Sequence, residues 1–152
     1  MNLEQIQSKM MMAVDEEDYH LALELAHKAV DLTDSEKKAW CLLNVADILI
    51  KQKNYEKAGK TAIKAGQILQ PMYGADSYEY AYVCLYLGKV YFNLNKYEVS
   101  RQCLDFFVQS AKSHLRNLTD VEDKANIELL IEDARMGILA NSEIIQHNML
   151  ME

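Results

Sequence analysis

The stretch YAYVCLYLGKVYFNLNKYEVS, which runs from Tyr80 to Ser100, decides the fold. Its first part is almost entirely apolar, a short polar turn follows around Asn95, and a second helix begins near Tyr97. The apolar residues of the first part fall on two neighbouring helical faces, so this helix should be covered on both sides. The stretch therefore predicts a helical hairpin whose first helix is sandwiched between other helices.

Related phrases occur elsewhere in the chain. KNYEKA, at Lys53–Ala58, returns as NKYEVS at Asn95–Ser100, and EDYHLA at Glu17–Ala22 is an earlier, weaker version. Their tyrosines lie at positions 19, 55 and 97, which gives separations of 36 and 42 residues. Periods of this length are typical of repeat proteins. The sequence therefore predicts a row of similar helical hairpins.

The best-preserved hairpin resembles a known repeat. Leu87, Gly88 and Tyr91, with Tyr97 and Glu98 after the turn, are similar to the signature of the tetratricopeptide (TPR) repeat. The resemblance covers roughly residues 18–115, and both intervals are longer than the 34 residues usual in that family. It implies an all-α, right-handed superhelical stack of three TPR-like helix-turn-helix units and a C-terminal capping helix.

We expect one TPR-like domain over residues 1–152. Its units should span about 2–32, 34–70 and 77–115, with the C-terminal helix at about 120–150. Two T-x-x-E capping boxes, Thr33 with Glu36 and Thr119 with Glu122, should open the second unit and the last helix. Pro71 should end a helix, and Asn141 with the following serine is a candidate break in the last helix.

Composition limits the function. The formal net charge of −7 and the sequence pI near 5.1 argue against a nucleic-acid partner, which requires phosphate neutralisation by Lys and Arg. No apolar run approaches the roughly 18 residues needed to cross a bilayer, so no membrane partner is expected. The N-terminus lacks the order of a signal peptide. Cys41, Cys84 and Cys103 have no metal-type spacing and are expected to be reduced thiols, so we expect a cytoplasmic protein.

No catalytic constellation is evident, so we expect neither an enzyme nor a cofactor. His20, Glu24 and His27 share one helix face, but the TPR alignment places them on the outer, solvated face, so no metal is expected. Lysines gather in the middle unit, where a solvated face and a surface for an acidic partner are both consistent with the pattern; they are Lys51, Lys53, Lys57, Lys60 and Lys64.

The resemblance also implies a binding surface, because partner peptides bind TPR arrays along the concave face lined by the first helix of each unit. Transferred residue by residue, this groove presents aromatic and aliphatic side chains with a polar rim. Its expected residues are Trp40, Leu43, Asn44, Asp47, Lys51, Tyr82, Leu85, Tyr86, Lys89 and Asn93. Of the clamp with which some members bind acidic tails of heat-shock chaperones, only Asn44 is present, so an apolar or amphipathic peptide or helix is the expected ligand.

The function expected from this resemblance is a non-enzymatic protein–protein interaction module, acting as an adaptor, co-chaperone or assembly factor. Two alternatives stay open. One is a small secretion-type chaperone that shields apolar segments of other proteins. The other is a self-associating structural subunit, such as a homodimer, whose groove is covered by its own C-terminal helix or by a second copy.

Overall fold

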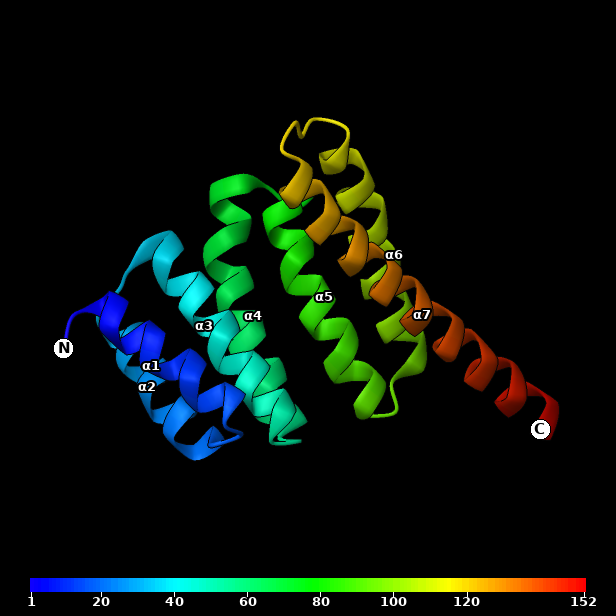
Figure 1. Cartoon of the computed structure of the whole chain (residues 1–152). Helices are drawn as coiled ribbons and strands as arrows, with labels where there is room; N and C mark the ends of the chain where they lie inside the picture. The colour runs from blue at the N-terminus through cyan, green and yellow to red at the C-terminus, as the bar shows by residue number, and fades with distance from the viewer. The chain divides into compact units, whose positions relative to one another are not determined.

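The computed structural model describes every residue from Met1 to Glu152 and is entirely α-helical, as predicted (Figure 1). The contacts within the chain divide it into two compact units, residues 1–72 and residues 73–152. Seven helices make up the chain: α1 (Leu3–Asp15), α2 (Tyr19–Asp31), α3 (Ser35–Lys51), α4 (Tyr55–Tyr73), α5 (Tyr78–Asn93), α6 (Tyr97–Leu115) and α7 (Val121–Met151).

The first unit is built on small residues. α2 packs against both α1 and α3, and α4 runs back beside α3 after a short turn (Figure 1). Ala22 and Ala26 of α2 and Ala58, Ala62 and Ala65 of α4 are all completely buried. Their spacing places them on one stripe of each helix. Because their side chains are short, the helix backbones can approach closely, and the larger Leu and Ile side chains of α3 fill the space between them.

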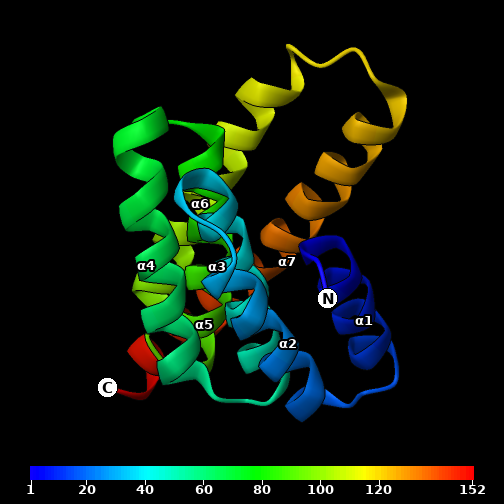
Figure 2. The ribbon, with the colours of Figure 1, turned by 90° about the vertical axis from the view of Figure 1, so that its left-hand side faces the viewer.

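The second unit is a three-helix assembly. α6 packs against both α5 and α7, and an extended loop joins α6 to α7 at one end of the unit (Figure 2). Phe107 of α6 is fully buried at its centre, in contact with the rings of Tyr78 and Tyr82. The Tyr78 ring also stacks on His114, with 4.3 Å between centroids and 3° between planes. α7 thus covers the apolar side of α6, the role expected of a C-terminal capping helix.

The turns inside the three hairpins repeat the same backbone geometry. Glu17, Lys53 and Asn95 each adopt a positive φ, of 58°, 61° and 64°. In each turn the next N–H donates to the carbonyl five residues earlier, as in Asp18 to Ala13 and its equivalents. This is the hydrogen bond of a Schellman motif, which closes a helix through one left-handed residue. Because the three positions are separated by the same 36 and 42 residues as the tyrosines, the sequence repeat is also a structural repeat.

Helix starts differ from the sequence expectation by one residue. The α3 N-cap is Asp34, while the Thr33 hydroxyl donates to the carbonyls of Ala29 and Val30 and so closes α2 instead. The α7 N-cap is Asp120, whose carboxylate accepts from the Asp123 N–H at 2.9 Å. The expected capping boxes are therefore wrong. Asp120 takes the capping position from Thr119, whereas the Thr33 hydroxyl is engaged at the end of α2 and the Asp34 side chain makes no capping hydrogen bond.

Two expected helix breaks are also wrong. α4 continues through Pro71 to Tyr73. The proline lies in the exposed last turn, where its missing N–H removes only one helical hydrogen bond near the end of the helix. α7 is continuous past Asn141 because that side chain is fully buried, donating to the Gly137 carbonyl one turn earlier and to the Ser100 hydroxyl of α6. The Asn141 side chain therefore links α7 to α6 instead of breaking α7.

Candidate functional site

An apolar hollow lies between α5 and α7 in the second unit, and we call it the α5/α7 hollow. Its volume is about 350 Å³. Three of the residues expected to form a binding groove line it: Leu85, Lys89 and Asn93. The remaining lining comes from all three helices of the unit: Gly88, Phe92, Leu104, Asp133, Ala134, Met136, Gly137 and Ala140.

Two glycines form the base of the hollow. Gly88 on α5 and Gly137 on α7 both lie against Leu104 of α6. A Cβ at Gly88 would lie 2.4 Å from Leu104 Cδ2, and one at Gly137 would lie 2.7 Å from Leu104 Cδ1. Neither position has room for a side chain while Leu104 stays in place. Leu104 therefore occupies the space that side chains at Gly88 and Gly137 would need, and all three residues line the hollow.

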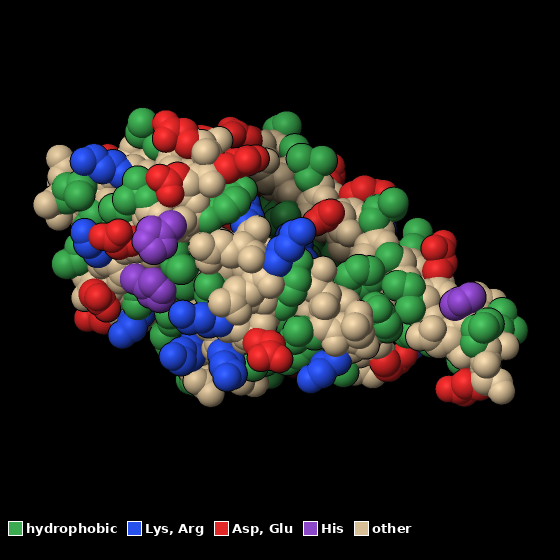
Figure 3. All heavy atoms as spheres, turned by 90° about the horizontal axis from the view of Figure 1, so that it is seen from below, with side chains coloured by type: hydrophobic (Ala, Val, Ile, Leu, Met, Phe, Trp, Pro, Cys, Tyr) green, Lys and Arg blue, Asp and Glu red, His purple; other side chains and the backbone are tan.

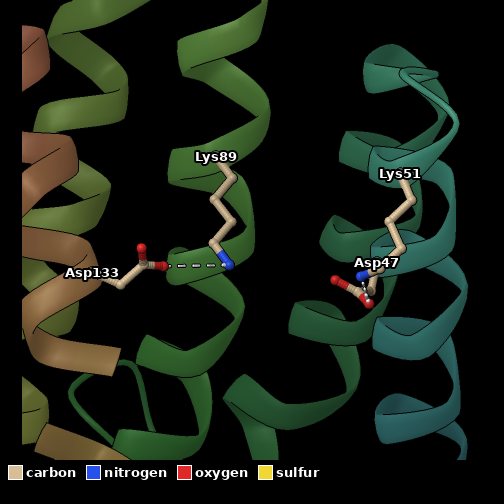
Figure 4. Close-up of polar contacts among 4 residues, drawn as sticks. All are labelled: Asp47, Lys51, Lys89 and Asp133. Atoms are coloured by element: carbon tan, nitrogen blue, oxygen red, sulfur yellow. Dashed lines mark hydrogen bonds and ion pairs between the residues drawn. The ribbon is translucent and has the colours of Figure 1, made fainter. Parts of the chain in front are cut away.

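Polar groups stand at the rim. Lys89 Nζ lies 3.8 Å from Asp133 Oδ2, which joins α5 to α7 across the opening (Figure 4). The Lys89 ammonium also lies 5.7 Å from the centre of the Tyr86 ring. Both charged side chains of this pair are substantially exposed, so the ion pair contributes little to the stability of the fold. Either side chain is therefore able to pair with a ligand instead. The hollow therefore combines an apolar floor with charged groups that could orient a ligand.

Aromatic side chains extend this surface along α5. The ring centroids of Tyr82 and Tyr86 lie 5.6 Å apart, and Tyr82 contacts Tyr78 at 6.1 Å. Tyr82 and Tyr86 are half-buried, so each keeps part of its ring accessible. Burial, with smaller effects of the neighbouring Tyr82 and Glu79, raises the pKa of Tyr78 to about 12. Tyr78 is therefore neutral at physiological pH, and its ring packs against those of Tyr82 and Phe107.

The α3 residues of the expected groove lie in the first unit. Asn44 and Asp47 line a separate hollow of about 440 Å³ between α1 and α3, together with Gln7 and Met11. Asp47 Oδ2 accepts from Lys51 Nζ at 2.7 Å, one turn along the same helix (Figure 4). The Trp40 indole N–H donates to Glu36 at 3.3 Å. Leu43 is buried, as is Leu85 of α5, so both support the surface from below.

Sequence reasoning missed the contribution of α7. Asp133, Met136 and Gly137 line the α5/α7 hollow, whereas the sequence assigned their helix to capping, to covering the groove or to self-association, and not to the lining of a binding site. Gly137 is the residue from which the contribution of α7 could have been predicted. A glycine costs about 1 kcal/mol relative to alanine inside a helix, so its presence there indicates close packing against another element.

The chemistry available in the chain is limited. No cluster of three or more His, Cys, Asp or Glu side chains is arranged to hold a metal ion, and His20, Glu24 and His27 are all exposed. Burial raises the pKa of the Cys84 thiol to about 12 and also raises that of Cys103, so neither is activated as a nucleophile. None of the helices has the length and apolarity to cross a membrane.

One comparison with solved structures bears on this arrangement. The crystal structure of the Sgt2 TPR domain from Aspergillus fumigatus superposes with a TM-score of 0.69 at 16% sequence identity. The match covers 96% of this chain and 80% of that one. The chain has a TPR-like fold. No family model and no curated protein sequence matches it. At this identity the TPR likeness describes the fold, and the function must be argued from the surfaces of the molecule.

Proposed function

We propose that this TPR-like protein is a non-enzymatic protein–protein interaction module that binds an apolar or amphipathic peptide of a partner in its groove. The α5/α7 hollow carries the proposal, because it offers an accessible apolar socket beside the exposed edges of Tyr82 and Tyr86. Protein-binding sites commonly combine a pocket for an apolar anchor with a polar rim. Here Lys89, Asn93 and Asp133 provide that rim.

The size of the hollow fits one or two anchoring side chains. Burying one Leu, Ile, Met or Phe side chain is worth about 1.5–3 kcal/mol. A ligand helix presents such residues three or four positions apart, so one apolar face could fill the hollow and continue over the tyrosines of α5. The charged rim would then fix its direction. Binding of this kind suits an adaptor, a co-chaperone or an assembly factor.

Other properties of the chain support a protein ligand. The formal charge of −7 disfavours nucleic acid. All three cysteines are free, and Cys41 and Cys84 are buried, which supports a reducing, cytoplasmic location. We also propose, from the repeated turns and from the TPR-like fold, that the hairpins form one functional domain.

A matched pair of substitutions on α7 tests the site. Met136 lines the hollow and is 59% exposed, whereas Leu139 on the same helix is 58% exposed and lies outside it. Peptides are first selected from a random display library with the full chain, and their dissociation constants are then measured for Met136→Glu and Leu139→Glu. We expect Met136→Glu to weaken binding roughly tenfold or more, since it places a charge in the socket, and Leu139→Glu to leave it nearly unchanged.

The same measurement can reject the proposal. Equal dissociation constants for the two variants would place peptide binding elsewhere. Selection of only hydrophilic peptides would contradict the apolar floor. Thermal unfolding of both variants controls for folding, and because both residues are exposed, both variants should stay folded.

Self-association is a second candidate, favoured by the end of α7. Met149, Leu150 and Met151 are exposed in succession, and no charged residue lies between them. Exposed apolar clusters of this kind often mark contacts with another chain. Sedimentation of the unmodified chain and of Met149→Glu/Leu150→Glu tests it: a larger species lost in the variant supports self-association, and a monomer in both cases excludes it.

A further inference from the structure

A further hollow lies in the first unit, apart from the hollow between α1 and α3, and its lining is positively charged. It lies between α2 and α4 above the N-terminal half of α3, with a volume of about 900 Å³, and we call it the basic groove. Lys57, Lys60 and Lys64 of α4 line one side, and Lys38 of α3 adds a fourth ammonium group. Lys57 and Lys64 are separated by two helical turns, about 10 Å along α4.

The charge of this groove contrasts with that of the chain. Its lining contains four lysines and one glutamate, Glu56, which gives a formal charge of +3, although the whole chain carries −7. None of the four lysines forms an ion pair in the structure, whereas Lys28, Lys51 and Lys89 do. A space-filling view shows Lys and Arg side chains gathered beside histidines on one face (Figure 3). The groove is thus a local positive site with unpaired cations.

The floor of the groove is apolar. Val30 of α2, Leu42 of α3 and Ile68 of α4 line it, and Val30 is only 8% exposed. Lysines that only face solvent do not require apolar side chains between them. The combination of aliphatic floor and cationic edge matches a ligand that is apolar on one side and acidic on the other.

We propose that the basic groove binds an acidic amphipathic segment of a partner protein. Leu or Ile side chains of that segment would rest on Val30, Leu42 and Ile68, and its Asp or Glu side chains would pair with the lysines of α4. Neither nucleic acid nor an anionic membrane fits as well. Both are extended polyanions that the acidic remainder of the chain would repel, and phosphates gain nothing from an aliphatic floor.

This site is independent of the α5/α7 hollow, because no residue lines both. It would let the protein hold two different partner segments at once. Affinity at the basic groove should fall with added salt, since it depends on exposed charges. Affinity at the α5/α7 hollow should change much less, since that hollow is mainly apolar.

The test uses the full chain and a fluorescein-labelled synthetic peptide with Glu and Leu arranged on opposite faces of a helix. Lys57→Glu/Lys60→Glu/Lys64→Glu reverses the edge of the groove. Lys9→Glu/Lys96→Glu/Arg116→Glu makes the same change of net charge at exposed positions outside it. We expect the first triple variant to lose at least roughly tenfold in affinity and the second to lose much less. Lys57→Arg/Lys60→Arg/Lys64→Arg should keep binding.

Three further arms complete the test. The same peptide with Gln in place of Glu should bind weakly, and so should one with Ser in place of Leu. Met136→Glu should leave binding of the Glu/Leu peptide unchanged, which separates this site from the α5/α7 hollow.

Several results would overturn the proposal. They are no binding of the Glu/Leu peptide, an equal loss in both triple variants, or tighter groove-dependent binding of a single-stranded oligonucleotide or of vesicles containing an anionic lipid. A dimer in sedimentation that only the groove triple variant abolishes would also overturn it, because the occupant would then be a second copy of this chain.

Discussion

The Asn141 amide of α7 donates a hydrogen bond to the Ser100 hydroxyl of α6 across 2.9 Å, and both side chains are completely buried. Ser100 in turn donates to the Gly88 carbonyl of α5 at 2.6 Å. One chain of hydrogen bonds therefore links all three helices of the second unit beneath the α5/α7 hollow. The Asn141 Oδ1 atom has no partner, so the network is not fully satisfied.

Replacing Ser100 should expose the cost of this network. Ser100→Ala removes the acceptor of one Asn141 N–H and leaves that buried donor unpaired, so we expect a loss of about 1–3 kcal/mol of unfolding free energy in urea denaturation. Ser100→Ala/Asn141→Leu removes both polar groups together with the unsatisfied oxygen, and it should recover a large part of the loss. Additive effects in this double-mutant cycle would show that the two side chains are not coupled.

The two glycines against Leu104 should respond unequally to alanine. A Cβ at Gly88 would meet two atoms of Leu104 within 2.6 Å, whereas one at Gly137 would meet a single methyl group at 2.7 Å. Overpacking costs typically about 1–3 kcal/mol, and each alanine regains about 1 kcal/mol of helix propensity. We therefore expect Gly88→Ala to lower stability and Gly137→Ala to be closer to neutral. The reverse order in thermal or urea unfolding would contradict this packing.

The left-handed turn residues offer a second matched pair. Lys53 and Asn95 both have positive φ, of 61° and 64°. That conformation costs most L-residues roughly 1–2 kcal/mol, and asparagine tolerates it better. Lys53→Gly should therefore stabilise the protein by up to about 1 kcal/mol, and Asn95→Gly by less. An equal or greater gain at Asn95 would show that the lysine is not strained.

Alkaline pH should weaken the fold through two protonated groups, the buried Cys84 and the half-buried Tyr78. Burial, with a smaller effect of Cys103, raises the pKa of Cys84 to about 12, and that of Tyr78 is also raised to about 12. The folded pKa values exceed the unfolded ones, so this stability is fully present below the unfolded values and is lost as pH rises toward 12. Urea midpoints should fall above about pH 9, and less steeply in Cys84→Ala or Tyr78→Phe. An unchanged slope in both variants would exclude these groups as the cause.

Much of the fold could be predicted from the sequence because its signals are local. The apolar faces around Leu85 and the recurring tyrosines at 19, 55 and 97 specify helices and hairpins without any knowledge of distant contacts. α5 and α6, at Tyr78–Asn93 and Tyr97–Leu115, together occupy the third unit expected at about residues 77–115.

What could not be predicted depends on contacts between distant residues. Asn141 looked like a helix break because its partner Ser100 lies 41 residues away in the sequence. The α5/α7 hollow was predicted only in part for the same reason. The role of Gly137 depends on its packing against Leu104 of α6, which the sequence alone does not reveal. The basic groove needed α2, α3 and α4 together, because its apolar floor is spread over all three helices.

The most direct test of the account is to map where a selected apolar peptide binds. A display-selected peptide carrying a photoreactive diazirine at its central apolar residue is crosslinked to the full chain, and the products are located by mass spectrometry. We predict crosslinks to the lining of the α5/α7 hollow, in particular to Met136 and to residues near Lys89. Crosslinks confined to other surfaces, while these positions stay unmodified, would contradict the proposal that this hollow is the peptide-binding site.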